Sequence, residues 1–517
     1  MPKKAKTFYI STPIYYPSGP LHIGHVLTTT LAWVYANYKK QEGYETFFVT
    51  GIDEHGQKIQ KKALALNLHP QEYVDRECKR FRDLWILLGI DYDFFSRTTN
   101  TLHQETIKKV FNKMLEKGYI YKGNYEGLYS VEDEEFFTKS QATKKDGKYY
   151  HPVSGHLLQE IQEESYFFKM SMFSDWILQY FKNNPEFITN EVITNELINN
   201  FLKQGLEDLS ITRITFDWGI KLDTNDKAKH IVYVWLDALF NYLTALNYLE
   251  GNDSNYQKFW VNGNERCHIL GKEISRFHSI YWPIFLKSLD LNLPTTEIVH
   301  SWIVTPTGKM SKSKGNVIDP LALIQEYGAE QVKYFFASQV NINSDYTFSQ
   351  ETFINVLNAD LANNFGNLVN RVIKMINQSF PQGCKYDAKS LEEIDKEIYE
   401  KINIRVSEFQ KYMDVFQSDK ALKTAIKFSS ELNEYIDKTL PWTLKNNLPR
   451  LNTVLMTLLN GIYAAAYMLN IVMPNKMQIV ATALKQKSIN KKDLNNYKKF
   501  DGICPWSDQV LFTRILK

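Results

Sequence analysis

The chain has 517 residues, of which 44% are hydrophobic and 23% charged, and its formal net charge is +3 at pH 7. This length predicts about three domains, and the small net charge permits a polyanionic partner without predicting one. No segment approaches the roughly 20 apolar residues that cross a bilayer, we see no secretory signal, and four scattered cysteines exclude a disulfide framework. We therefore expect a cytoplasmic protein with no membrane contact.

The first part of the chain alternates strand-like and helix-like segments. Strand composition marks residues 7–13 and 46–50, and apolar residues recur at helical spacing in residues 24–40, 57–66 and 71–88. This alternation predicts an α/β fold with a doubly wound, parallel, Rossmann-like sheet, whose ligands bind beyond the carboxyl ends of its strands. Neither a Gly-rich dinucleotide fingerprint nor a P-loop occurs, so we expect phosphates to be held by other groups.

The composition and periodicity of the sequence then change four times. Short strands and turns, followed by helical stretches, fill residues 119–225 and interrupt the alternating pattern, which returns in residues 226–300. A lysine-rich loop region follows, and helical periodicity dominates from residue 349 onward. We predict a sheet domain in two halves (1–118 and 226–300), an inserted domain (119–225), a loop region (301–348) and an all-α domain (349–517).

Two short motifs that lie nearly 300 residues apart suit the same ligand. The first, PLHIGH, places His22 and His25 around Gly24, so that imidazole donors stand beside a backbone that a ligand can approach closely. The second, KMSKS, offers the ammonium groups of Lys309 and Lys312 in a Gly-flanked loop. Taken alone, the first is equally a helix start with two surface histidines, and the second a solvated loop. Together they favour a polyphosphate whose charge must be stabilised as it leaves.

In this order and at this spacing, the two motifs resemble the signature pair of class I aminoacyl-tRNA synthetases. Further segments extend the resemblance to bacterial-type methionyl-tRNA synthetases over essentially the whole chain: TPIYYPSGPLHIGH, FVTGIDEHGQK, VYVWLDAL and ILGKEISRFHSIYWP. The resemblance implies that the chain ligates L-methionine to tRNA(Met). The reaction would pass through a methionyl-adenylate formed from ATP with Mg²⁺, and would release pyrophosphate and AMP.

The resemblance also implies roles for individual residues. It assigns the chemistry to His22, His25, Lys309 and Lys312, and ATP contacts to Gly24, His25, Gly271, Glu273 and Lys312. It assigns the methionine ammonium to Asp53 and the methionine side chain to Ile14, Trp235, Ala238, Tyr242, Phe277, His278 and Trp282. Aromatic walls suit sulfur, and Tyr242 suits a polar contact to it. It assigns the CAU anticodon to Asn367, Arg371 and Trp442, through stacking and base-edge hydrogen bonds.

Each assignment has a plainer alternative. Asp53 would equally serve as a helix N-cap, the GKE segment at Gly271 as an ordinary turn, and the pocket aromatics as core packing. Without the resemblance, Asn367 and Arg371 would be read as a polar helix face and Trp442 as a buried tryptophan. For the whole chain, the alternatives are another class I synthetase (leucyl, valyl or cysteinyl) and a non-catalytic tRNA-binding paralogue.

One departure from the resemblance concerns zinc. Many relatives carry zinc-binding cysteines in the inserted domain, but here Ser130 and Asp133 hold the C-x-x-C spacing without a thiol. Two histidines, His151 and His156, remain, and they are poor evidence for a closed zinc site. We predict no structural zinc. Because the chain ends soon after the helical domain, we expect a monomer.

Overall fold

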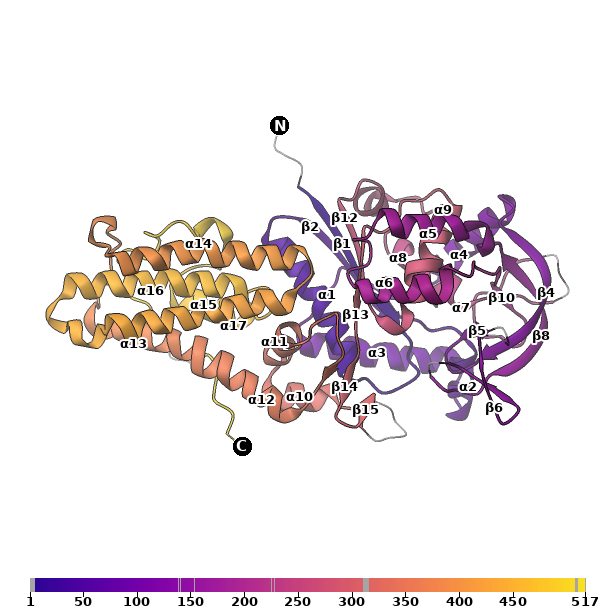
Figure 1. Cartoon of the computed structure of the whole chain (residues 1–517), viewed down its shortest axis with the longest axis horizontal. Helices are drawn as coiled ribbons and strands as arrows, with labels where there is room; N and C mark the ends of the chain where they lie inside the picture. The colour runs from indigo at the N-terminus through magenta and orange to yellow at the C-terminus, as the bar shows by residue number, and fades with distance from the viewer. Residues whose placement is uncertain are drawn as a thin grey trace. The chain divides into compact units, whose positions relative to one another are not determined.

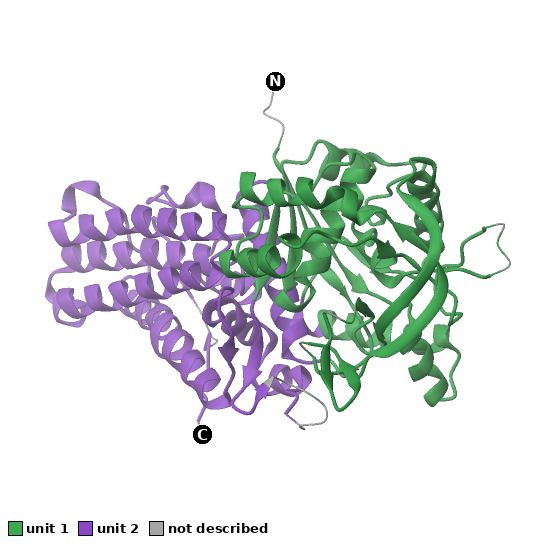
Figure 2. Cartoon of the chain, turned by 45° about the vertical axis from the view of Figure 1, so that its right-hand side comes forward, with its two compact units in different colours: residues 1–21, 45–86, 90–300 green, residues 22–44, 87–89, 301–517 purple. Residues whose placement is uncertain are grey.

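The computed structural model describes residues 5–137, 139, 141–152, 154–224, 226, 228–309, 316–506 and 510–516, without the side chain of Lys309. Its contacts divide the chain into two compact units. Unit 1 comprises residues 1–21, 45–86 and 90–300, and unit 2 comprises residues 22–44, 87–89 and 301–517 (Figure 2). The four domain boundaries expected from the sequence stay a prediction.

Unit 1 is built on a five-stranded parallel sheet in the order β13-β12-β1-β2-β3. Its strands are β1 (Thr7–Tyr15), β2 (Glu45–Ile52), β3 (Phe94–Arg97), β12 (Glu265–Gly271) and β13 (Thr296–His300). Strands β2 and β3 extend the sheet on one side of β1, and β12 and β13 extend it on the other, so the strand order reverses at β1. The doubly wound parallel sheet expected from the sequence is confirmed. In such sheets ligands bind at the reversal, beyond the carboxyl ends.

An antiparallel sheet with the order β5-β4-β8-β9 is inserted between β3 and β12 (Figure 1). Its long pair, β4 (Ile120–Ser130) and β8 (Gln159–Phe168), runs in register from Ile120–Phe168 to Tyr129–Gln159. The shorter members are β5 (Glu135–Phe137) and β9 (Leu209–Ser210), and a separate hairpin pairs β6 (Thr143–Lys145) with β7 (Lys148–Tyr150). One aromatic-rich core, with Phe168, Trp260 and Trp282, is shared by both sheets.

The remaining elements of unit 1 connect these sheets. The helices are α2 (Gln57–Ala65), α3 (Pro70–Leu88, with its last two residues in unit 2), α4 (Thr101–Glu116), α5 (Ser174–Asn183), α6 (Glu191–Leu197), α7 (Val234–Leu239), α8 (Asn241–Thr244) and α9 (Trp282–Ser288). A short ladder pairs β10 (Thr212–Arg213) with β11 (Ile231–Val232).

Unit 2 is mainly helical. Its helices are α1 (Ile23–Gln41), α10 (Pro320–Tyr327), α11 (Ala329–Gln339), α12 (Gln350–Val356), α13 (Asn367–Ser379), α14 (Glu393–Asp414), α15 (Ser418–Thr439), α16 (Leu448–Leu469) and α17 (Pro474–Ala483). Three short strands form one sheet: β14 (Ile303–Thr305), β15 (Gly308–Lys309) and β16 (Tyr346–Thr347).

Helix α1 begins inside the motif HIGH (residues 22–25) and is hydrogen-bonded to the helical part of unit 2. The Tyr35 hydroxyl donates to the Phe416 carbonyl at 2.7 Å, and the Tyr38 hydroxyl donates to Asp414 Oδ1 at 2.9 Å. The ammonium of Lys333, on α11, lies 3.7 Å from the centre of the Trp33 ring. These contacts fix the orientation of the helix whose first turn carries His22 and His25.

Among the described helices, α16 is the one long and apolar enough to cross a membrane by composition, contrary to our reading of the sequence. Its mean hydropathy over the best window is 1.2, but 94% of that window is buried inside the protein. It packs against α13, α14, α15 and α17. Burial of this kind is typical of the core helix of a bundle, whose residues are apolar on every side.

Candidate active site

The carboxyl ends of three parallel strands in unit 1 carry the segments singled out in the sequence. Tyr16 follows β1, Asp53 follows β2, and Lys272 and Glu273 follow β12. The carboxylate of Glu273 folds back over Gly271, where an added Cβ would lie 2.5 Å from Oε2. Because these strands are parallel neighbours, the three segments share one edge of the sheet.

Asp53 is a buried carboxylate with one unsatisfied oxygen. Asp53 is only 7% exposed, and its Oδ1 accepts no hydrogen bond from any described residue. Burial, followed by the charges of Asp237 and Glu134, raises the pKa of Asp53 well above its usual value. A buried, unpaired carboxylate oxygen costs free energy, and a cationic ligand group would remove that cost.

The loop that follows Asp53 is held from several sides. Arg97 Nε donates to Glu54 Oε1 at 2.7 Å, and the Glu54 amide donates to Thr98 Oγ1 at 2.9 Å. The indole of Trp218 donates to the Glu54 carbonyl at 2.6 Å. The amide of Asp53 itself donates to the Tyr15 carbonyl at 2.9 Å. These bonds fix the backbone at Asp53 and Glu54.

A buried histidine–aspartate–histidine cluster lies close enough to influence Asp53. Asp237 Oδ2 lies 2.6 Å from His55 Nδ1, and Oδ1 lies 2.7 Å from His103 Nε2. Burial acts to raise the pKa of Asp237, but the two imidazoles hold it below its usual range. Our reading of the sequence missed this cluster. His55 and Asp237 do lie within quoted motifs, whereas nothing distinguishes His103 in its helix.

The aromatic residues predicted to line a side-chain pocket do meet. The rings of Trp235 and Phe277 stack with centroids 3.8 Å apart and planes 7° apart. His278 stands edge-on to Trp235, and Tyr242 and Trp282 are buried beside them. Trp282 donates to His268 Nε2 at 3.1 Å, which places it in the packed core behind this wall. Ala238 is also buried, and Ile14 pairs with Gly51 across β1 and β2.

The hydrogen bonds of His278 define its tautomer. Nδ1 lies 3.0 Å from the Ile274 carbonyl and must carry the proton, so Nε2 accepts from the Tyr242 hydroxyl at 2.7 Å. Burial lowers the pKa of His278 to about 4, which keeps the ring neutral. The hydroxyl proton of Tyr242 is therefore donated to His278. The oxygen lone pairs and the ring face of Tyr242 remain for contact with other groups.

In unit 2 the two histidines of the HIGH motif form the start of α1. His22 is the N-cap, and its Nδ1 accepts from the Gly24 amide at 3.1 Å, while His25 Nδ1 accepts from the His22 amide at 3.1 Å. Both Nδ1 atoms are acceptors, so each neutral ring carries its proton on Nε2. Burial, followed by the proximity of His22, lowers the pKa of His25 well below its usual value. Both rings are thus neutral N–H donors.

The lysine loop is described only at its base. Lys309 ends β15, and Lys312 lies outside the described residues. Asn316 Nδ2 donates to Thr305 Oγ1 and to Thr307 Oγ1, each at 3.0 Å, and so ties the two ends of the loop together.

The three residues expected to contact an anticodon lie on helical elements of unit 2. Asn367 is the exposed first residue of α13, and Arg371 follows one turn later, 4.0 Å from Asp437 near the end of α15. Trp442, in the short helix that follows α15, is 47% exposed. A tryptophan this exposed does not pack in the protein core, and its ring is accessible for stacking.

Comparison with known proteins identifies the family. Residues 8–373 match the model of the class I tRNA synthetases (M). The chain is 52% identical over 510 residues to a methionine–tRNA ligase of Mycoplasmopsis pulmonis, with 99% of each chain covered, and 47% identical over 453 residues to that of Bacillus subtilis, with 86% and 67% covered. The chain belongs to the methionine–tRNA ligases.

A solved structure agrees with this assignment. The Mycobacterium tuberculosis methionyl-tRNA synthetase in complex with methionyl-adenylate is 30% identical, with a TM-score of 0.91 over 98% of this chain and 100% of that one. The predicted family, fold class and enzyme class are confirmed: the chain is a class I aminoacyl-tRNA synthetase with methionine–tRNA ligase activity, which uses ATP. Another class I synthetase and a non-catalytic paralogue are therefore set aside.

The two residues that hold the C-x-x-C spacing lie in a hydrogen-bonded cluster, which we call the Asp133 knuckle: Ser130, Asp133, His151, Ser154 and His156. Asp133 accepts from Ser130, Ser154 and His156, with His156 Nδ1 at 2.9 Å. His151 Nδ1 accepts from the Ser154 amide at 3.0 Å, so Nε2 carries the proton and faces Glu135 at 3.2 Å. Asp133 and His151 Nδ1 thus accept hydrogen bonds within the cluster, and none of its five residues offers a thiol.

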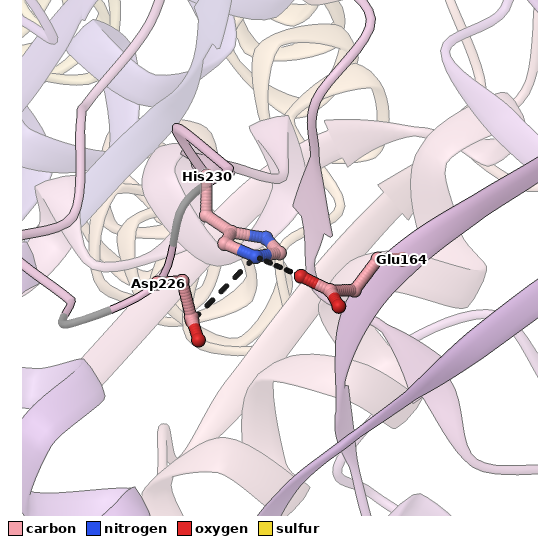
Figure 3. A group of neighbouring side chains, drawn as sticks. All are labelled: Glu164, Asp226 and His230. Carbon is pink, nitrogen blue, oxygen red and sulfur yellow. Dashed lines mark hydrogen bonds and ion pairs between the residues drawn. The ribbon is translucent and has the colours of Figure 1, made fainter.

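A second cluster, Glu164, Asp226 and His230, brings three ligand-type atoms within 4.8 Å of one another (Figure 3). His230 Nε2 lies 3.3 Å from Glu164 Oε1. However, Lys122 Nζ binds both carboxylates, at 2.9 Å and 2.6 Å, and the Tyr166 hydroxyl donates to Asp226. Both carboxylates are already bound by the lysine, and Asp226 by the tyrosine as well, so we assign no metal to this cluster.

Proposed function

We propose that the chain joins L-methionine to ATP in unit 1 with Asp53 as the partner of the methionine ammonium group, and then transfers the methionyl group to tRNA(Met). The observation that supports this most is the buried Asp53 carboxylate, one oxygen of which lacks a hydrogen-bond partner among the described residues. An α-ammonium group would donate to that oxygen and balance its charge. The Trp235–Phe277 stack offers a polarisable wall for the thioether.

In the first step, the methionine carboxylate attacks the α-phosphorus of ATP, which enters as its magnesium complex, to give methionyl-adenylate and pyrophosphate. In the second step, the terminal adenosine of tRNA(Met) attacks the activated carbonyl and AMP leaves. The chain contributes positioning and charge stabilisation. We assign the phosphates to His22, His25, Lys309 and Lys312 and to the space over Gly24, and the ribose to Gly271 and Glu273. A cytoplasmic monomer remains our prediction.

The function is tested by ATP–pyrophosphate exchange with the whole chain. We expect exchange with L-methionine and Mg-ATP, and none with leucine, valine or cysteine. Exchange that follows another amino acid, or that needs no amino acid, would contradict the assignment of the pocket.

We further propose that Trp442, with Asn367 and Arg371, contacts the anticodon. Trp442→Ala should lower kcat/KM for tRNA(Met) about 10- to 100-fold, because base–aromatic stacking contributes roughly 1–3 kcal/mol per base. Methionine-dependent exchange, which needs no tRNA, should not change. Trp506→Ala is a matched control, since Trp506 is also exposed (66%). Equal loss with both variants would argue against a specific contact.

We also propose that the Asp133 knuckle folds without zinc. Burial acts to raise the pKa of Asp133, but hydrogen bonds from Ser130 and His156 hold it below its usual range, so the carboxylate is ionised at neutral pH. The purified enzyme should contain no stoichiometric zinc, and exchange should survive a strong chelator of zinc once Mg²⁺ is restored. One zinc per chain by elemental analysis would overturn this proposal.

A further inference from the structure

The turn that follows β4 contains a buried acidic residue with an unusual backbone. Glu134 is 5% exposed and has φ +53°, in the left-handed region that non-glycine residues rarely adopt. Nothing in the composition of the turn requires this conformation. A strained, buried carboxylate persists where surrounding contacts hold it, and such positions concentrate at functional sites.

Each carboxylate oxygen of Glu134 accepts hydrogen bonds, and two of the donors adjoin Asp53. Oε1 accepts from the Tyr16 hydroxyl and from the Lys58 amide, each at 3.1 Å, and Oε2 accepts from the Tyr129 hydroxyl. Tyr16 follows the residue whose carbonyl binds the Asp53 amide, and Lys58 lies in the first turn of α2, directly after the Asp53 loop. Glu134 therefore links the ends of β1 and β2 across their shared edge.

The same turn reaches the other two pocket segments. Tyr233, which lies two residues before Trp235, donates from its hydroxyl to the Glu134 carbonyl at 2.8 Å. The neighbouring Glu135 binds the guanidinium of Arg276, which directly precedes Phe277 and His278. One turn of the inserted domain thus contacts all of the segments that carry the predicted methionine-binding residues from Asp53 to His278.

Gly56 shows how tightly this junction is packed. Its φ of +109° already favours glycine, and an added Cβ would lie 2.7 Å from the Tyr16 hydroxyl and 2.8 Å from Glu134 Oε1. The backbone of the Asp53 loop can approach the Tyr16–Glu134 pair only because residue 56 has no side chain.

We propose that Glu134 is a positioning residue for methionine binding: it fixes Tyr16 and the start of α2, and thereby holds Asp53 where the methionine ammonium group is bound. The inference rests on the proposed role of Asp53. It assigns to the inserted domain a share in amino-acid binding, although Glu134 itself touches no substrate. Its effect should appear in methionine binding and not in ATP binding.

The test is ATP–pyrophosphate exchange with KM measured separately for methionine and for ATP. Glu134→Ala should raise KM for methionine about 10- to 100-fold, as expected for loss of hydrogen bonds to a charged group, and leave KM for ATP within about twofold. Glu134→Gln keeps an acceptor for Tyr16 and the Lys58 amide and should restore KM to within about fivefold of the parent. Tyr16→Phe should raise KM in the same direction, without adding fully to Glu134→Ala.

Glu126→Ala, at an exposed position of β4, is the matched control and should match the parent. If Glu134→Ala does not fold, Glu134→Asp replaces it: the shorter side chain withdraws the carboxylate from Tyr16 and should raise KM for methionine, unlike Glu134→Gln. An unchanged KM for methionine, parallel changes in both KM values, or full additivity with Tyr16→Phe would overturn the inference. Absence of methionine-dependent exchange in the parent would instead contradict the proposed function.

Discussion

Asp53→Asn should lower kcat/KM for methionine in ATP–pyrophosphate exchange by about 10²–10³-fold, with little change in KM for ATP. Removing one partner of a buried ion pair costs roughly 3–5 kcal/mol, because the other charge is left unpaired. Asn has nearly the shape of Asp, so the loop held by Glu54 should keep its structure. The matched control is Asp83→Asn on the surface of α3, where the ion pair with Lys79 is exposed and contributes little.

The same carboxylate should give methionine binding a pH dependence. Burial, then the charges of Asp237, Glu134 and Glu54, raise the pKa of Asp53, and the His55 amide opposes the rise. As the pH falls through this raised pKa, a proton competes with the ammonium group, so KM for methionine should rise toward acid pH. When KM for methionine is measured as a function of pH, the parent should show this rise and Asp53→Asn should not. Identical profiles would exclude Asp53 as the titrating group.

His22→Ser should lower kcat for exchange by about 10²-fold and change either KM little, since removal of one preorganised donor to developing charge typically costs 10²–10³ in kcat. Serine is a good N-cap, so it preserves the start of α1 and removes only the Nε2–H donor. Thermal unfolding should therefore match that of the parent. The matched control is Asn100→Ser, which exchanges the N-cap of α4 in the same way.

A kcat for His22→Ser close to that of the parent would show that His22 acts only as a helix cap. If kcat falls together with the unfolding temperature, the loss belongs to helix stability, and the proposed contact with the phosphates is contradicted.

Local patterns predicted the elements that hold the site, and the reasons are physical. Strand composition located β1 and β2 because parallel strands are buried on both faces. The family resemblance singled out Asp53, and the end of β2 at Ile52 places this residue at the carboxyl edge of the parallel sheet. The start of α1 at the two motif histidines, and the meeting of Trp235 with Phe277, agree with what the sequence motifs led us to expect.

The sequence did not reveal partners that only folding brings together. Asp237 meets His55 and His103 across 182 and 134 residues, and no local pattern signals such a pairing. Glu134 lies in an acidic run that is typical of a solvated turn, yet the protein buries it against Tyr16. Helix α16 is buried over 94% of its most apolar window, and its hydropathy alone does not distinguish a bundle core from a membrane span.

The central claim, that Asp53 pairs with the ammonium group of methionine, is tested most directly by a binding cycle. Calorimetry would measure the binding of methionine and of its desamino analogue to the parent and to Asp53→Asn. We predict that the parent prefers methionine strongly and that Asp53→Asn loses most of this preference, with a coupling energy of about 2 kcal/mol or more. An equal preference for methionine in both proteins, and hence no coupling, would contradict the account.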